Sequence, residues 1–320
     1  MSRPKILVSA PLVGDHVAEL ARDFDVETTE RPTGLTQDEL RARVADKDAL
    51  LAVLTLKIDA TLLVAAPRLR VVANHAVGFD NVDLDACRAR NVIVTNTPGV
   101  LTEATADLAF GLILDACRRI TEGDRLVRAE GFPPWSTSFL LGKRVHRATL
   151  GVVGLGRIGQ AVARRARGFE MRVLYASRTR APETIERALG AEHRSLDELL
   201  SESDVVSLHA PLDASTRGMI SRDRILRMKR GAILVNTARG ALVDERALAE
   251  ALHAGHLGGA GLDVYAREPE IDPLLLTAPR AVLAPHVGSA DFEARDAMAR
   301  LACESIRDVL EGRAPKHRVA

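Results

Sequence analysis

The stretch Leu150-Gly151-Val152-Val153-Gly154-Leu155-Gly156-Arg157-Ile158-Gly159 decides the fold of this 320-residue chain. Its first four residues are apolar or small and predict a buried strand, while residues 160–167 after it predict a helix. The pattern Gly-x-Gly-x-x-Gly lies between the two. Its first glycine permits a tight turn, the second lets the backbone approach a pyrophosphate, and the third allows close packing of helix on strand. In this context residues 154–159 are predicted to bind a dinucleotide rather than to form a plain glycine-rich turn.

Short apolar runs like this strand recur along the chain and alternate with segments of helix length. The runs are residues 5–8, 50–54, 71–73, 93–95, 150–153, 172–175, 205–208, 233–236 and 282–283. Strands separated by helices imply βαβ units and a parallel sheet. Because each run is apolar almost throughout, we expect helices on both faces of the sheet. The predicted fold class is α/β, with doubly wound parallel sheets.

Length and composition set the number of domains and exclude some partners. A chain of 320 residues exceeds the usual size of a single hydrophobic core, so two domains are expected. Hydrophobic residues make up 47% and charged residues 27%, which is typical of a globular protein. The 44 Lys and Arg nearly cancel the 43 Asp and Glu, so no long-range field favours nucleic acid or an anionic membrane.

The termini and the cysteines bear on location. The start of the chain holds no long apolar segment and no small-residue cleavage site, and no run approaches the about 18 apolar residues of a membrane helix. The three cysteines are far apart and form no Cys-x-x-Cys pair, so neither a disulfide framework nor a metal site is expected. The expected location is the cytoplasm, with no membrane contact.

The segment after the run 172–175 bears on the choice of cofactor. A fold that prefers NAD places an acid about 20 residues after the glycines, where it accepts from the ribose 2′-hydroxyl. Here the segment reads Ser177-Arg178-Thr179, and the first carboxylate is Glu183. The two hydroxyls can donate hydrogen bonds and Arg178 can pair with a 2′-phosphate. NADP(H) is therefore the predicted cofactor and NAD(H) the alternative. A solvated basic loop is the competing interpretation.

Three ionisable residues follow strand or loop patterns in the last third of the chain. They are Arg239 in Asn236-Thr237-Ala238-Arg239-Gly240, Glu268 in Asp263-Val264-Tyr265-Ala266-Arg267-Glu268-Pro269, and His286 in Ala284-Pro285-His286-Val287-Gly288. With these segments the chain resembles the D-isomer-specific 2-hydroxyacid dehydrogenase family along nearly its whole length. Further matching segments are Val77-Gly78-Phe79-Asp80-Asn81, Asn96-Thr97-Pro98-Gly99 and His209-Ala210-Pro211-Leu212. Within the family it is most similar to the glyoxylate and hydroxypyruvate reductases.

The resemblance implies an enzyme that reduces a small 2-keto acid to its D-2-hydroxy acid. The carbonyl carbon needs a hydride, the carbonyl oxygen needs a proton, and the carboxylate needs a cation. His286 is the natural proton donor, because imidazole titrates near neutrality. Glu268 would favour the imidazolium and fix its orientation. Arg239 offers a planar fork of donors suited to the carboxylate.

The resemblance also assigns the remaining site residues. Val77 and Gly78 match a loop whose backbone amides hold the substrate carboxylate, and Trp135 matches a tryptophan that reaches a neighbouring subunit's substrate pocket. A homodimer is therefore expected. Besides the glycine motif and residues 177–179, the positions that match the cofactor's surroundings are Thr105, His209, Ala210, Pro211, Thr216, Thr237, Ala238, Asp263 and Gly288.

By resemblance the chain forms two Rossmann-like domains with the cleft between them. Residues 1–98 and 288–320 are expected to bind substrate, and residues 99–287 to bind the dinucleotide. The latter would include a dimerisation arm at about 121–148, where Pro133, Pro134 and Trp135 interrupt the helical pattern.

Two alternatives stay open at this point. One is a dehydrogenase acting on D-lactate, D-glycerate or 3-phosphoglycerate, which would share the same three ionisable residues. The other is a dinucleotide-sensing binding protein of the same fold. The sequence does not decide which 2-keto acid is the physiological substrate or in which direction the reaction runs in the cell.

Overall fold

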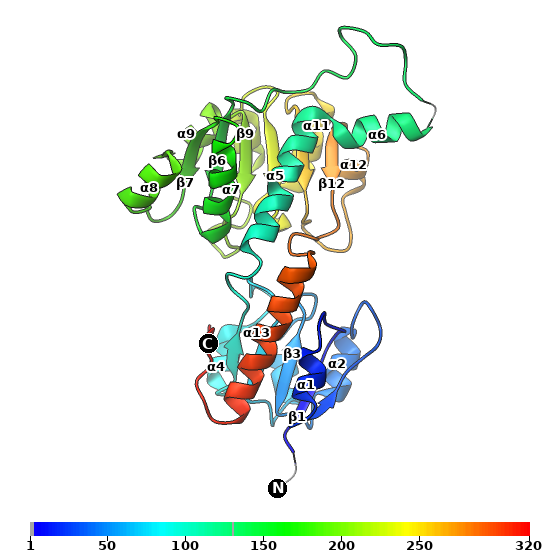
Figure 1. The fold of residues 1–320 in the computed structure, drawn as a ribbon, viewed down its shortest axis with the longest axis vertical. Helices are drawn as coiled ribbons and strands as arrows, with labels where there is room; N and C mark the ends of the chain where they lie inside the picture. Colours follow the sequence, from blue (N-terminus) through cyan, green and yellow to red (C-terminus); the bar gives the residue numbers. More distant parts are fainter. Residues whose placement is uncertain (1–2, 130) are drawn as a thin grey trace. The chain divides into compact units, whose positions relative to one another are not determined.

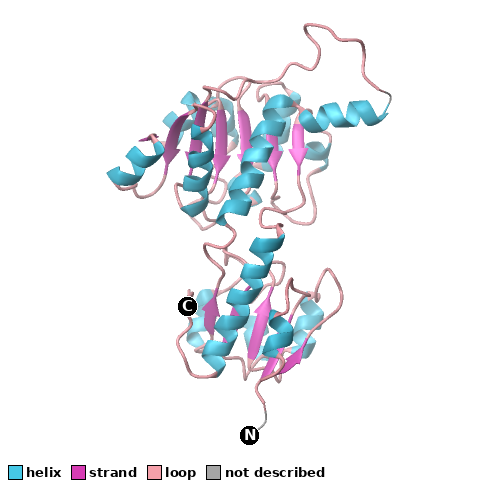
Figure 2. Ribbon diagram, in the orientation of Figure 1, coloured by secondary structure: helices cyan, strands magenta, loops and turns pink. Residues whose placement is uncertain are grey.

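The chain separates into two compact units, each built on one parallel sheet. The computed structural model describes residues 3–129 and 131–320. The first unit comprises Met1–Leu101 and Ser289–Ala320, and the second comprises Thr102–Gly288. Figures 1 and 2 show helices on both faces of each sheet.

The first unit holds a five-stranded parallel sheet in the order β2-β1-β3-β4-β5. Its strands are β1 (Lys5–Val8), β2 (Asp25–Glu27), β3 (Ala49–Ala52), β4 (Val71–Asn74) and β5 (Ile93–Thr95). Its helices are α1 (His16–Leu20), α2 (Gln37–Arg43), α3 (Ala60–Ala65), α4 (Leu84–Ala89) and α13 (Phe292–Leu310). Successive strand residues face opposite sides. Leu7 therefore joins the core with Leu40 of α2, whereas Ile6 joins the core with Ile306 of α13.

The second unit holds a seven-stranded parallel sheet in the order β12-β11-β10-β9-β6-β7-β8. Its strands are β6 (Thr149–Val153), β7 (Arg172–Ala176), β8 (Ala191–His193), β9 (Val205–Leu208), β10 (Ile233–Asn236), β11 (Gly259–Leu262) and β12 (Ala281–Leu283). Its α-helices are α5 (Thr102–Arg118), α6 (Ile120–Ala129), α7 (Arg157–Arg167), α8 (Glu183–Leu189), α9 (Leu196–Glu202), α10 (Arg222–Arg227), α11 (Glu245–His253) and α12 (Pro273–Leu276), with a 3₁₀ turn at Gly240–Leu242. The strand order changes direction at β6, where the glycine motif follows.

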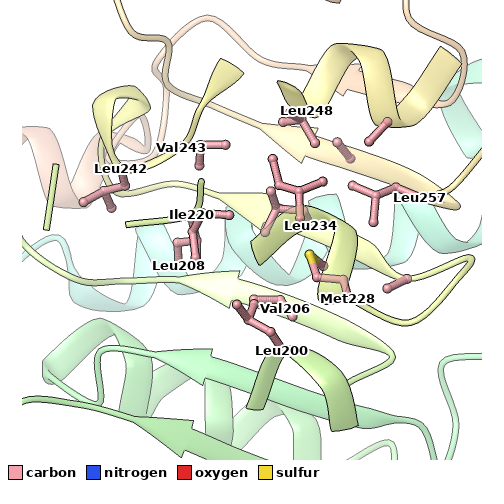
Figure 3. Close-up of a cluster of buried hydrophobic side chains, with 14 of the residues drawn as sticks. Leu200, Val206, Leu208, Ile220, Met228, Leu234, Leu242, Val243, Leu248 and Leu257 are labelled. Atoms are coloured by element: carbon pink, nitrogen blue, oxygen red, sulfur yellow. The ribbon is translucent and has the colours of Figure 1, made fainter. Parts of the chain in front are cut away.

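Two hydrophobic cores cover the faces of this second sheet. Val206 of β9 and Leu234 of β10 point to one core, shown in Figure 3, which also contains Leu200 of α9 and Leu248 of α11. The neighbouring residues of the same strands point to the other core, which holds side chains of α5 and α7. This alternation explains why the strands read as unbroken apolar runs. The predicted fold class, two doubly wound parallel-sheet units, is confirmed.

Three strands were not predicted, and each lacks the apolar signal for a physical reason. β2 and β8 are three-residue edge strands that include acidic residues. β11 lies inside the sheet but reads Gly-Ala-Gly-Leu. A Cβ at Gly261 would come within 2.9 Å of Leu112 of α5, so glycine permits the close approach of the long helix. The structure also starts the helix after β6 at Arg157, so the last residues of the glycine motif form its first turn.

Helix α6 differs from the other helices of its unit because it has no buried side chain. α5 and α6 are separated by Arg119, whose φ is 57°. Figure 1 shows α6 and the segment after it extending away from the sheet of their own unit. Ile120, Val127, Phe132 and Trp135 on this stretch are exposed, Trp135 by 85%. Residue 130, inside the expected arm, lies outside the described residues.

Candidate active site

The glycine motif forms a turn at the carboxyl end of β6 that is open on one side. Gly154 has a φ of 94°, and a Cβ there would meet the main chain of His209 and Ala210. A Cβ at Gly159 would collide with the carbonyl oxygen of Gly154. At Gly156, in contrast, a Cβ would meet nothing within 4 Å. The glycines thus pack the turn against its neighbours and leave free space at the N-terminus of α7, where backbone N–H groups favour an anion.

The other motif residues have different surroundings. Leu155 is buried in the core that contains α5 and α7, which holds the turn in place. Arg157 is exposed in the first turn of α7, and Ile158 is partly buried. Gly156 is the N-cap of α7, and no side chain caps the helix there. The first-turn N–H groups of this 11-residue helix suit a pyrophosphate.

The segment after β7 is basic, but the structure adds an acid from elsewhere. Ser177 donates its hydroxyl to the carbonyl oxygen of Thr179 at 2.6 Å. Arg178 pairs with Asp213 at 3.0 Å, although its side chain stays 70% exposed. Asp213 also accepts from the N–H and the hydroxyl of Ser215, and these hydrogen bonds, followed by the charge of Arg178, lower its pKa. Sequence reasoning missed this carboxylate, because it belongs to the loop after β9 rather than to the segment after β7.

The loop after β9 lies beside the glycine turn. The N–H of His209 donates to the carbonyl oxygen of Val153 at 2.7 Å. Its Nε2 is 2.8 Å from Ser207 Oγ, and burial lowers its pKa to about 4, which keeps the ring neutral. Thr216 donates its hydroxyl to the carbonyl oxygen of Pro211 at 2.7 Å and closes the loop. Ala210 is buried against Gly154. These predicted cofactor residues therefore lie at the carboxyl ends of β6 and β9.

Glu268 and His286 form a short hydrogen bond beyond the carboxyl end of the same sheet. His286 Nδ1 lies 2.6 Å from Glu268 Oε2, while Glu268 Oε1 accepts from the N–H of Tyr265 at 2.9 Å. Burial raises the pKa of the Glu268 carboxyl, but the hydrogen bonds from His286 and Tyr265 and the nearby charges of His286 and Arg239 outweigh it. The net pKa of Glu268 lies below its ordinary value. The carboxylate is therefore ionised at neutral pH.

Arg239 is held by the turn after β10. Asn236, at the end of that strand, donates its amide to the carbonyl oxygen of Arg239 at 2.8 Å and accepts from the N–H of Ala238 at 3.0 Å. A Cβ at Gly240 would collide with the main chain of Tyr265, so only glycine lets this turn pack against the segment that carries Glu268. The charge of Arg239 acts on Glu268, which places all three predicted catalytic residues in one region of the second unit.

The residues around His286 fix its position. Asp263 is 1% exposed and accepts from the N–H of Val287 at 2.8 Å. Burial raises the pKa of Asp263, against the hydrogen bonds from Val287 and Gly288. A Cβ at Gly288 would lie 3.1 Å from Asp263 and 3.5 Å from Thr105, so these predicted cofactor residues are neighbours. His286 itself has a φ of 56°, a left-handed conformation that residues other than glycine adopt infrequently and that costs free energy.

The residues present suit a bound dinucleotide. Within residues 3–129 and 131–320, the buried hydroxyl of Thr237 has no hydrogen-bond partner. Thr237 precedes Ala238 in the loop after β10. The open space at Gly156 is likewise at the carboxyl end of a strand of this sheet. A polar ligand at the carboxyl end of the sheet could form a hydrogen bond with the Thr237 hydroxyl.

Over the same described residues, no group of three or more His, Cys, Asp or Glu could hold a metal ion, and no helix has the length and apolar character needed to cross a membrane.

Three predicted substrate contacts belong to other segments of the chain than the predicted catalytic residues. Val77 and Gly78 belong to the first unit, in the loop after β4. Trp135 lies on the segment after α6 and is exposed. Asn236 was also missed by sequence reasoning, although a polar residue that ends an apolar strand was a usable signal.

The fold and this set of residues define a dinucleotide-dependent oxidoreductase, and known proteins agree. The model of the D-isomer specific 2-hydroxyacid dehydrogenase NAD binding domain matches residues 110–288. The glyoxylate reductases of Thermococcus kodakarensis and Pyrococcus furiosus are 46% and 45% identical over 98% of this chain, and 95% and 94% of those proteins are covered. The chain belongs to the D-isomer-specific 2-hydroxyacid dehydrogenase family, in its glyoxylate reductase branch, as expected from the sequence.

Solved structures are similar along the whole chain. A crystal structure of a Thermus thermophilus protein superposes with a TM-score of 0.92 at 47% identity, covering 99% of this chain and all of that one. An NADPH-dependent glyoxylate/hydroxypyruvate reductase from Sinorhizobium meliloti, solved with NADP and malonate, gives a TM-score of 0.82 at 34% identity over 100% and 97% of the two chains. The present chain is an NAD(P)-dependent oxidoreductase that reduces a keto acid to a hydroxy acid.

Proposed function

We propose that the chain reduces glyoxylate or hydroxypyruvate to the corresponding 2-hydroxy acid, of D configuration where carbon 2 is a stereocentre. The observation that carries the proposal is the Glu268–His286 pair beside Arg239, in the unit that holds the glycine motif. The glyoxylate reductases among the relatives and the Sinorhizobium meliloti enzyme support these two substrates.

Each of the three residues has a distinct task in this reaction. The bound nicotinamide would supply the hydride to the carbonyl carbon. Because Nδ1 of His286 faces Glu268, its other ring nitrogen, Nε2, is the one that donates a proton to the carbonyl oxygen. The ionised Glu268 favours the imidazolium and keeps the ring oriented. Arg239 binds the carboxylate and polarises the ketone, because its guanidinium stays charged and matches a planar anion.

The proposed cofactor is NADP(H) in preference to NAD(H). Ser177, Arg178 and Thr179 supply two hydroxyls and a cation where an acid would select NAD. Arg178 is exposed and reaches Asp213 in a single ion pair, so a dianionic 2′-phosphate can compete for it. Residues 154–159 would hold the pyrophosphate. Thr105, His209, Ala210, Pro211, Thr216, Thr237, Ala238, Asp263 and Gly288 are the further proposed cofactor contacts.

The proposed assembly is a homodimer formed through α6 and the segment after it. This stretch extends away from the sheet of its own unit (Figure 1). Its side chains Ile120, Val127, Phe132 and Trp135 are exposed, and a second copy would cover them. Trp135 is the proposed contribution to the partner's substrate pocket. Sedimentation should give a dimer, and Trp135→Ala should raise the KM for keto acid. A fully active monomer would exclude this assembly.

The cytoplasm is the proposed location, since the three cysteines are free and buried.

A substrate panel assayed with NADPH and NADH tests the proposal. It compares glyoxylate and hydroxypyruvate with pyruvate and with 3-phosphohydroxypyruvate, which represent the alternative dehydrogenases. We expect the highest kcat/KM for one of the first two, with NADPH. A higher kcat/KM for pyruvate or the phosphorylated acid would reassign the substrate. Cofactor binding without turnover of any of the four would instead favour a dinucleotide-sensing protein.

A further inference from the structure

The loop after β4 in the first unit has three successive carbonyl groups that accept hydrogen bonds. The carbonyl oxygen of Ala76 accepts from the N–H of Thr97 at 3.0 Å. The next carbonyl, of Val77, accepts from the side-chain amide of Asn96 at 2.8 Å. The third, of Gly78, accepts from the side-chain amide of Asn74 at 2.8 Å. Three successive carbonyls are thus bound to the body of the unit.

This anchoring determines where the loop's N–H groups point. In a trans peptide the carbonyl oxygen and the following N–H point in opposite directions. The only cis peptide bond of the described residues is Glu268–Pro269, so the three peptides of this loop are trans. Each N–H group of Val77, Gly78 and Phe79 is therefore turned away from the donor that anchors the preceding carbonyl: the N–H of Thr97, the amide of Asn96 and the amide of Asn74, respectively. Successive N–H groups on one side of a turn form a concave site for an anion.

The anchoring amides are themselves fixed. Asn74 is fully buried, and its oxygen accepts from the side-chain amide of Asn81 at 3.1 Å. The same amide of Asn81 donates to the carbonyl oxygen of Leu56 at 3.0 Å. Asn96 is 8% exposed, and its N–H donates to the carbonyl oxygen of His317 at 3.2 Å. A carboxylate could not replace these amides, because it can only accept hydrogen bonds at neutral pH.

We propose that Asn74 and Asn96 are positioning residues that hold the N–H groups of Phe79 and Gly78 in place, next to that of Val77, to bind the carboxylate of the 2-keto acid. The inference rests on the proposed function and on the carboxylate-binding loop that the family resemblance implies for Val77 and Gly78, and it adds the role of the two side-chain amides. The carboxylate is not altered in the reaction, so its hydrogen bonds are equally strong in the bound substrate and in the transition state. Loss of such an interaction raises KM and leaves kcat nearly unchanged.

Two variants and one control test the inference. Asn74→Asp keeps the size of the side chain but sets an acceptor against the carbonyl of Gly78, and Asn96→Ala removes a donor without adding charge. The control is Gln37→Ala, because Gln37 donates its amide to the carbonyl of Lys57 at 2.9 Å in another loop of the same unit. Thermal unfolding confirms that each variant is folded, and Asn96→Ala, at the less buried site, serves if Asn74→Asp does not fold.

The measurement is KM and kcat for glyoxylate and for its uncharged methyl ester, together with NADPH titration. A hydrogen bond to a charged group is worth a factor of about 10 or more, so KM for glyoxylate should rise about 10-fold or more in both variants. The kcat, the NADPH affinity and the KM for the ester should stay near the wild-type values, and Gln37→Ala should resemble the wild type throughout.

The outcomes separate the inference from the proposed function. If the wild type reduces glyoxylate and the folded variants keep its KM, or lose glyoxylate and ester equally, the positioning role is wrong and the function stands. If the wild type reduces none of the 2-keto acids, the proposed function itself fails. In that case oxalate binding, measured by calorimetry, still tests the loop: weaker oxalate binding by both variants supports the anion site, and unchanged binding overturns it.

Discussion

The two sheets of the molecule end in loops of different chemistry. In the first unit, the loop after β4 is fixed by the neutral amides of Asn74 and Asn96. In the second, the loops after β10 to β12 carry Arg239, Glu268 and His286. A carboxylate that passes through the reaction unchanged can be bound by fixed dipoles, whereas an oxygen that gains a proton needs a group that titrates. In the proposed reaction the titrating pair Glu268 and His286 acts where a proton is transferred, and the neutral amides act where the backbone must be held.

The strongest test of this difference is removal of the titrating group. His286→Ala leaves only water to donate the proton, and a positioned proton donor is worth about 10²- to 10⁴-fold, so kcat should fall by that factor. NADPH titration by fluorescence should be unchanged, because the glycine motif is untouched. His253→Ala, at the exposed end of α11, is the matched control. Near-normal turnover of His286→Ala would mean that the proton comes from another residue.

The next effect concerns the charge that we propose selects NADP(H) over NAD(H). Arg178→Ala removes the proposed partner of the 2′-phosphate, and the KM for NADPH should rise about 10- to 150-fold while that for NADH stays nearly constant. Arg180→Ala is the control, since Arg180 lies two residues away and pairs with Glu186 instead. Equal losses with both cofactors would remove Arg178 from cofactor selection.

A third effect concerns the pH dependence. The pKa of Glu268 lies below its ordinary value, so its interaction with His286 is lost at a lower pH than that at which a free carboxyl is protonated. Glu268→Gln removes the charge that favours the imidazolium. The alkaline limb of kcat/KM for glyoxylate should then move down by about one pH unit or more, which is about a tenfold loss on that limb.

The acidic side of the same profile should survive in part, because the imidazolium still forms at low pH. Glu270→Gln, an exposed change in the same loop, should leave the whole profile in place. An unshifted alkaline limb in Glu268→Gln would show that this carboxylate does not control the proton donor.

The smallest expected effect concerns the exposed ion pair between Arg178 and Asp213. Asp213→Asn releases Arg178 and removes a negative charge near the proposed 2′-phosphate site. Exposed ion pairs are worth about 0.2 to 1 kcal/mol, so the KM for NADPH should fall by a factor of about 1.5 to 5. The KM for NADH should not change. A rise in the NADPH KM would indicate that Asp213 orients Arg178 instead of competing for it.

The apolar strands were predictable because burial on both faces leaves a continuous signal, as in Val205–Leu208. The edge strands β2 and β8 lack that signal, and β11 lacks it because its glycines admit α5. The glycine motif was predictable from local order alone, since strand, turn and helix are consecutive. Arg239, Glu268 and His286 could be named from the family resemblance, but their convergence depends on turns after separate strands.

The supporting residues of the site were harder to predict because their partners are distant in the sequence. Asp213 meets Arg178 across 35 residues, and Asn96 meets Val77 across 19. The residues next to each partner in the sequence do not predict these contacts. Asn74 and Asn236 did carry a local signal, because each is a polar residue at the end of an apolar strand.

The left-handed backbone of His286 links activity to robustness. A residue other than glycine at this φ costs on the order of 1 kcal/mol, and the fold carries that cost at its proposed proton donor. Glycine adopts this conformation without a steric penalty. His286→Gly should therefore melt at a higher temperature than His286→Ala, although neither variant can donate a proton there. The difference in melting temperature between these two variants would measure the thermal stability that the backbone conformation at this position costs.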